Sequence, residues 1–298
     1  MSMVLINDFK LQGIADAIKA KRGSNEKMFP SEMPAAINAI SASGESENVN
    51  ELLASIADGS YQWGEFQGEE TNINSLIYNR QTPMSSYTNN NLKEINIDGA
   101  FSYNKLTSFK APNLDTLNNK SATFQYCDNL TEVDLGNVTK LPVATFYASK
   151  KIGYVPNADK ITEIGQQCFS FNPLISDLYL PQVQNIGPFA FAQCGNLQTI
   201  ILPSIISLTA NIFNNSHGIQ VVDLGDTCIS VTNSAFSGCK IDLTLIVRAV
   251  KPPTLNGSFM LGSGGAVISI LVPTEAVDAY KSATNWSNYA PVISAISN

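Results

Sequence analysis

Apolar side chains recur at a fixed interval through the C-terminal two-thirds of the chain. Eight phenylalanines follow one another at gaps of 22 or 23 residues: Phe101, Phe124, Phe146, Phe169, Phe191, Phe213, Phe236 and Phe259. The chain has 14 Phe in all, so more than half of them belong to this set. Self-similarity at a period of roughly 20–50 residues predicts a solenoid, in which each coil buries its apolar edge against its neighbours. We therefore expect the phenylalanines to form one buried spine.

Other positions keep phase with each Phe. Nine and eleven residues after it, paired apolar residues predict a short strand with one buried face: Val133 and Leu135, Leu178 and Leu180, Ile200 and Leu202, Val222 and Leu224, Leu245 and Val247, Ile268 and Ile270. Apolar residues also stand five positions before it: Leu141, Ile164, Ile186, Leu208 and Val231. Three positions after it come short side chains, which we expect to satisfy the backbone of an inward turn: Asn104, Cys127, Ser149, Asn172, Cys194, Ser216 and Cys239.

The two ends of the chain depart from this repeat. Residues 8–22 have helical apolar spacing at Leu11, Ile14 and Ile18, and a second short helix is expected to carry Ile37 and Ile40. These faces are too small to hold a core alone, so they predict attachment to another subunit, with the solenoid end as the alternative partner. At the other end, a last strand and a helix that begins near Pro273 are expected to close the core.

Four regions follow from these patterns. They are a helical attachment region with a linker (1–48), an N-terminal cap (49–90), the solenoid (91–250), and the last coil with a C-terminal cap (251–298). Atypical terminal repeats are expected, because the outer face of an end coil has no neighbour to cover it.

Composition excludes several classes of partner. The net charge of −7 and pI near 4.8 argue against nucleic acid, since binding the phosphate backbone needs a basic stripe. No apolar run approaches the ~20 residues that span a bilayer, so no membrane segment is expected. The first residues lack the basic and apolar regions of a secretory signal. The five cysteines are odd in number and mostly in phase with the repeat, so we expect buried free thiols rather than a disulfide framework.

A search for catalytic chemistry finds little. His217 is the single histidine, in a polar turn without a neighbouring nucleophile or second ligand. Cys127, Cys194 and Cys239 lie coils apart, too far for shared metal ligation. We therefore predict no catalytic residue, no metal site and no cofactor.

The remaining candidates are the outward residues of the predicted strands, eight and ten positions after each Phe. Tyr, Asp and Thr side chains in a row can stack on sugar faces, hydrogen-bond hydroxyls or contact a protein surface. The predicted binding strip comprises Glu132, Asp134, Tyr154, Asp177, Tyr179, Thr199, Ile201 and Asp223, with Val221 beside them. The alternative is an ordinary solvated sheet face.

Two segments resemble known families. The stretch FAFAQCGNLQTIILP (189–203) resembles the BspA-like leucine-rich repeat, and the C-terminal VPTEAVDAYKSATNWSNYAPVISAI is similar to the closing segment of that family. The resemblance implies an α+β fold: a solenoid of about eight coils of short strands, with a small helical N-terminal region and a strand–helix C-terminal cap. Members are typically surface or adhesion proteins without catalytic residues. The N-terminal IADAIKAKRGSNEKMFPSEMPAAINAI is similar to a segment that opens many phage and prophage tail proteins.

These resemblances lead to a main hypothesis and two alternatives. The main one is a non-enzymatic tail protein of the virion, made in the host cytoplasm, that docks to other tail or baseplate proteins through its N-terminal helices. Its solenoid would bind host cell-surface polysaccharide or protein, and a homotrimer is one state that the resemblance allows. The second is an adhesin on the bacterial cell surface, binding host protein or glycan. The third is a cell-wall or polysaccharide hydrolase.

Overall fold

The computed structural model describes residues 65–67, 69–74, 85–239 and 242–296. The chain divides into two compact units, Met1–Gln67 and Gly68–Asn298. The first unit contributes one described strand, β1 (Glu65–Gln67). The expected attachment helices, with Leu11, Ile14, Ile18, Ile37 and Ile40, lie outside the described residues.

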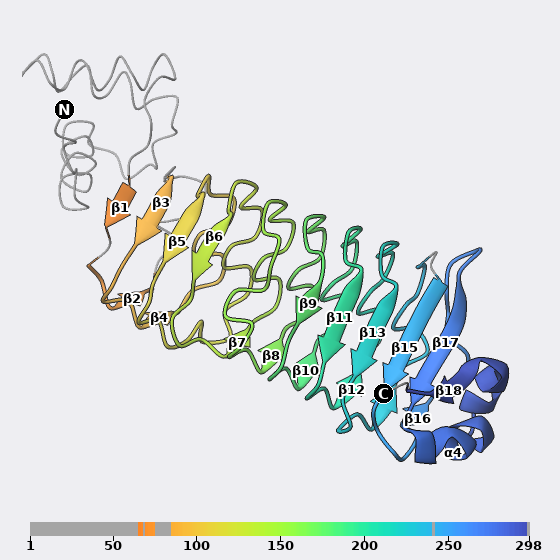
Figure 1. Ribbon diagram of the computed structural model, residues 1–298. Helices are drawn as coiled ribbons and strands as arrows, with labels where there is room; N and C mark the ends of the chain where they lie inside the picture. Colours follow the sequence, from red (N-terminus) through yellow and green to blue (C-terminus); the bar gives the residue numbers. More distant parts are fainter. Residues whose placement is uncertain (1–64, 68, 75–84, 240–241, 297–298) are drawn as a thin grey trace, which may run out of the picture. The chain divides into compact units, whose positions relative to one another are not determined.

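The second unit is a stack of coils, and one strand from most coils, usually the longer of the coil's two, lies on a common face (Figure 1). Neighbouring strands pair in parallel, and each is separated from the next by about one repeat. In chain order these strands are β3 (Ser86–Thr88), β5 (Ser108–Lys110), β6 (Glu132–Asp134), β9 (Leu178–Tyr179), β11 (Thr199–Leu202), β13 (Val221–Leu224), β15 (Asp242–Val247) and β17 (Ala266–Val272). The face is interrupted after β6, because β3, β5 and β6 belong to one sheet and β9 begins another.

A second row of two-residue strands runs along another side of the coils (Figure 1). Each contains one buried apolar residue, and five of these are the residues predicted to be apolar five positions before the Phe. The sequence therefore predicted the buried residues but missed the strands, since one apolar residue gives no alternation to detect. In chain order they are β2 (Asn72–Ile73), β4 (Glu94–Ile95), β7 (Lys140–Leu141), β8 (Glu163–Ile164), β10 (Asn185–Ile186), β12 (Ser207–Leu208), β14 (Ser230–Val231) and β16 (Thr254–Leu255).

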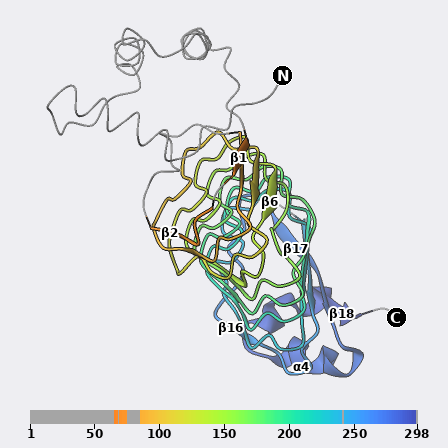
Figure 2. The same ribbon diagram turned by 90° about the vertical axis from the view of Figure 1, so that its left-hand side faces the viewer.

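The phenylalanine spine is present as predicted, and the coils that carry it overlie one another in Figure 2. From Phe101 to Phe236 the rings are fully buried and stacked face to face, with centroids 5.3–6.2 Å apart. Phe259 meets Phe236 edge-on, and the indole of Trp286 meets Phe259 in the same way. The spine thus forms one continuous core, since each ring contacts the rings before and after it.

From Cys127 to Cys239, the short side chains three positions after the Phe satisfy backbone groups, as expected. The thiols of Cys127, Cys194 and Cys239 donate to the Phe carbonyl oxygen of the preceding coil, at 2.9–3.1 Å. The hydroxyls of Ser149 and Ser216 do the same at 2.5 and 2.6 Å. A buried carbonyl left without a partner costs about 1–3 kcal/mol, so this row secures each coil to the one before it.

The C-terminal cap closes the last coil. It contains a 3-10 turn (Thr274–Ala276), helix α4 (Val277–Ser282), a second 3-10 segment (Trp286–Val292) and strand β18 (Ile293–Ala295), which pairs with β17. Trp286 and Tyr280 are buried and donate hydrogen bonds to the carbonyl oxygens of Pro253 and Ala249.

One predicted core position in this last coil is wrong. Ile268 was expected to face inward with Ile270, but its side chain is 52% exposed. The register between β15 and β17 shifts after Leu243. A bulge of this kind sends one extra residue out of the ladder. Ile270 and Val272 therefore take the inward positions.

Candidate functional site

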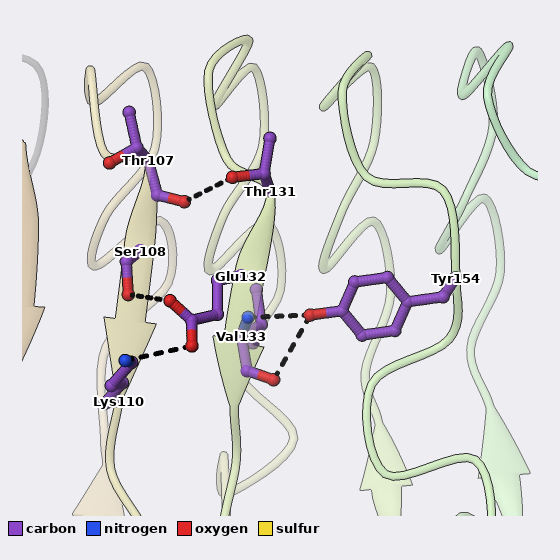
Figure 3. A network of polar contacts seen from close by, with 7 residues as sticks. All are labelled: Thr107, Ser108, Lys110, Thr131, Glu132, Val133 and Tyr154. Atoms are coloured by element: carbon purple, nitrogen blue, oxygen red, sulfur yellow. Dashed lines mark hydrogen bonds and ion pairs between the residues drawn. The ribbon is translucent and has the colours of Figure 1, made fainter.

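Strands β5 and β6 present a network of polar side chains on the outer face (Figure 3). The carboxylate of Glu132 accepts a hydrogen bond from the Ser108 hydroxyl at 3.1 Å and pairs with the Lys110 ammonium at 2.9 Å. The hydrogen bonds from Lys110 and Ser108 lower the pKa of Glu132. Because the register places Ser108 opposite Glu132, these contacts join two neighbouring coils.

Tyr154 belongs to the next coil, which contributes no strand to this face between β6 and β9. Its hydroxyl accepts from the Val133 backbone N–H at 2.8 Å and lies 3.5 Å from the Val133 carbonyl oxygen (Figure 3). The side chain thus occupies the place where a neighbouring strand would pair with β6. Pro156, two residues on, lacks a backbone donor, which disfavours a strand here. Partial burial raises the pKa of the Tyr154 hydroxyl.

A second group of predicted strip residues follows the row Tyr179, Ile201 and Asp223 on adjacent strands β9, β11 and β13. Tyr179 is 60% exposed and Ile201 is half-buried. Asp223 is a correction, since it was expected to face solvent and is only 5% exposed. Arg248 covers it, donating through Nε and Nη2 to the two carboxylate oxygens at 2.9 and 2.7 Å. Asp223 therefore holds coils together.

The other strip residues are placed less regularly. Asp134 is half-buried, lies opposite Lys110 and accepts from the Gly136 N–H at 2.9 Å. Asp177 is exposed just before β9, and Thr199 is half-buried beside Val221. The predicted strip is thus divided into two groups. One is on β6 and the following coil (Glu132, Asp134 and Tyr154), and the other runs along β9 to β13 (Asp177, Tyr179, Thr199, Ile201 and Asp223).

The sequence patterns did not identify three residues of this surface: Ser108, Lys110 and Arg248. The coil after Phe101 is one position out of phase with the others, because its inward residues are Phe109 and Ala111. Their spacing of two was the signal that marks Ser108 and Lys110 as outward. Arg248 directly follows the inward Val247, and no pattern in its own coil indicates that it reaches Asp223.

The surface is suited to binding by hydrogen bonds and by aromatic or apolar contact. All five cysteines are buried free thiols, and burial raises the pKa of Cys127, Cys168 and Cys194 to about 12. His217 is exposed at a turn. Within the described part of the chain, no group of three His, Cys, Asp or Glu residues could hold a metal ion, and no helix is long and apolar enough to cross a membrane.

Comparison with known proteins identifies the repeat. The family model "BspA type Leucine rich repeat region", in six copies, matches residues 65–176 and 120–242, well over half of the chain. No curated protein matches.

Two solved structures have distant similarity to this chain. One is a leucine rich cell surface protein from Faecalibacterium prausnitzii, 15% identical, with 78% of this chain and 90% of that chain covered and a TM-score of 0.34. The other is a leucine-rich repeat protein from Bacteroides ovatus, 12% identical, with 78% and 84% covered and a TM-score of 0.35. The family match, together with the in-phase spine and the short side chains that bind each preceding coil, assigns this chain to the BspA type leucine-rich repeat family.

Proposed function

We propose that the protein is a non-enzymatic binding protein of adhesin type that acts at a bacterial cell surface. It recognises protein or glycan through outward side chains of its coils. The observation that carries the proposal is the position of Tyr179, an aromatic side chain that is 60% exposed on the strand face beside Ile201. Exposed aromatic side chains beside apolar ones are characteristic of recognition surfaces.

Binding to cells tests this proposal through Tyr179→Ala. We expect the variant to bind intact cells of the recognised type more weakly than the native protein, with an unchanged melting temperature, because the side chain lies outside the core. Ile229→Ala is the matched control, since Ile229 is 66% exposed but lies off the long strands. Equal binding by native protein and Tyr179→Ala would remove this residue from the site.

The location is tested separately. An antibody against the protein should label intact producing bacteria, and the label should disappear after mild proteolysis of the cell surface. Label that appears only after the cells are opened would contradict surface display.

The phage-tail role stays a prediction from the sequence. It rests on the N-terminal resemblance, whose residues lie outside the described part of the chain, and the family match does not extend to them. The partners that belong to it, tail or baseplate proteins and a homotrimer, are predictions of the same kind. Co-sedimentation of the protein with phage-like particles, abolished when residues 1–48 are removed, would favour this role over the adhesin.

A further inference from the structure

Four aromatic side chains form a second row that the strand strip does not include. Tyr103, Tyr126, Tyr147 and Phe171 lie on the turn segments of four consecutive coils, one or two positions after the inward Phe. Tyr103 is 46% exposed and Phe171 is 44% exposed, while Tyr126 and Tyr147 are half-buried. We call these four residues the aromatic row.

The rings of the aromatic row contact one another in sequence. Tyr103 and Tyr126 are stacked with centroids 4.7 Å apart, Tyr126 meets Tyr147 edge-on at 5.5 Å, and Tyr147 meets Phe171 edge-on at 5.4 Å. Stacked and edge-to-face pairs are the two favourable arrangements of aromatic rings. Each ring is therefore held in place by its neighbours before any ligand arrives, which reduces the ordering cost of binding.

The backbone does not favour aromatic residues at these positions. Tyr103, Tyr126 and Phe171 have φ of 60°, 57° and 62°, in the left-handed region that side chains other than Gly and Asn rarely adopt. In the following coils the equivalent position is occupied by Gln193, Asn215 and Gly238, all at positive φ, and Gln193 and Asn215 donate the same coil-to-coil backbone hydrogen bond. Local stability alone would favour Asn or Gly at such a position, as at Asn215 and Gly238. Strained backbone that keeps a costly residue type is a reason to look for function.

An ion pair lies beside the aromatic row. Lys150 and Asp128 form an ion pair at 3.5 Å across two of its coils, and both act electrostatically on Tyr126. The chain as a whole carries a net charge of −7, which disfavours an anionic ligand. The surface therefore suits an uncharged ligand that offers apolar faces to rings and hydroxyls to tyrosines.

The dimensions of the aromatic row favour a linear ligand over a folded protein. Four partly exposed rings offer on the order of 400 Å² of contact area. A standard protein interface buries about 800 Å² per partner. A single file of rings matches a chain of sugar units better, because the apolar face of one pyranose covers about one ring.

We propose that Tyr103, Tyr126, Tyr147 and Phe171 form a stacking platform for an uncharged linear glycan, whose pyranose rings lie along the row. The proposal deepens the proposed function by naming a ligand class and a second surface, and it rests on that function being binding.

The test uses the full chain and an array of linear hexasaccharides, neutral and anionic. We expect neutral members to bind and anionic members to bind more weakly. Tyr126→Asn should lower the affinity for neutral hexasaccharides by about tenfold, since it removes the ring that links Tyr103 to the other two. Asn215 shows that Asn is accommodated at this backbone position, so the variant should fold. Gln193→Asn, at the equivalent position outside the row, is the matched control and should bind as the native protein does.

Several results would overturn the platform. They are no binding of any neutral hexasaccharide by the native protein, equal affinity of the native protein and Tyr126→Asn, or a native dimer that Tyr126→Asn dissociates. The cell-binding assay separates this proposal from the broader one. If native protein and Tyr126→Asn bind cells equally while Tyr179→Ala does not, the platform is refuted and the adhesin function stands. If the native protein binds neutral glycans but no cells, the platform stands and the surface role is refuted.

Discussion

The two halves of the solenoid are held together in different ways. In the N-terminal coils (residues 85–150) the strands β3, β5 and β6 have three residues each, and exposed ion pairs such as Lys110–Glu132 join neighbouring coils. In the C-terminal coils (residues 176–272) the strands lengthen to six residues in β15 and seven in β17. Exposed ion pairs contribute little to stability, whereas longer ladders fix more backbone. The comparison indicates that the C-terminal coils supply rigidity, while the N-terminal coils display aromatic and charged side chains.

The largest expected effect is loss of stability at alkaline pH, concentrated in the C-terminal coils. Those coils hold Cys194, Cys228 and Cys239, and burial raises the pKa of each above 9, to about 12, 11 and 11. A raised pKa means that the thiol stabilises the fold below pH 9, and that this contribution is lost as pH rises toward the folded value. The loss is about 1.4 kcal/mol per pH unit for each thiol.

Urea unfolding at pH 8, 9.5 and 10.5 under reducing conditions, followed by hydrogen exchange, measures this loss. Cys194→Ser is the control, because Ser already occupies the equivalent position at Ser149 and Ser216. The unfolding free energy of this variant should fall less steeply with pH, by about 1.4 kcal/mol per pH unit, because one buried thiol is absent. An equal slope would contradict the assigned pKa of Cys194.

The second effect concerns spine rings in the two halves. Phe124→Ala and Phe213→Ala each remove a fully buried ring, at a cost of about 3–5 kcal/mol. Because each coil contacts only its neighbours, we expect each variant to lose hydrogen-exchange protection mainly in its own half. Uniform loss across both halves in either variant would show one cooperative unit instead.

The third effect isolates the pair that secures β13 to β15. Arg248→Met leaves Asp223 buried without its cation. The variant should lose about 1.5–3 kcal/mol of unfolding free energy. We expect the lower part of this range, because Arg248 is half exposed. Asp223→Asn removes the charge but keeps an acceptor, and should cost less. Thermal unfolding of both variants at pH 7 tests the order; a greater loss in Asp223→Asn would reverse the argument.

The smallest effect lies at the interruption between the halves. Tyr154→Phe removes the hydroxyl that binds the Val133 backbone and should cost about 1 kcal/mol. Exchange of the Val133 amide should accelerate, while amides of β11 stay unchanged. Tyr147→Phe is a suitable control, because Tyr147 contacts the neighbouring rings of the aromatic row and lies outside this hydrogen bond. An unchanged Val133 amide would show that the Tyr154 hydroxyl does not protect it.

The spine and the short polar row were predictable because burial repeats in one dimension at fixed phase. Phe101 to Phe236 and Cys127, Ser149 and Cys194 all occupy their expected places. Exposure of the outward residues was less predictable, since it depends on side chains from the next coil. Asp223 has the spacing of a solvent-facing residue, yet Arg248 reaches it from 25 residues away in the chain.

Departures from the repeat were also beyond the periodic argument. The bulge beside Leu243 moves Ile268 outward. The Tyr154 hydroxyl accepts from the Val133 N–H, at the place where a neighbouring strand would pair with β6. The aromatic row was missed for a different reason. Its members follow the inward Phe at two different offsets, so they share a surface without sharing a phase.

The thiols and hydroxyls that bind the preceding coil give the solenoid a direction. Cys127 donates to the carbonyl of Phe101, and Ser149 donates to that of Phe124, so each of these carbonyls is bound by a residue that is synthesised later. On the ribosome N-terminal segments fold first, so at any moment only the most recently folded coil has a Phe carbonyl without its donor from the next coil. Assembly can then proceed like a zipper in step with translation, without requiring the distant end of the chain.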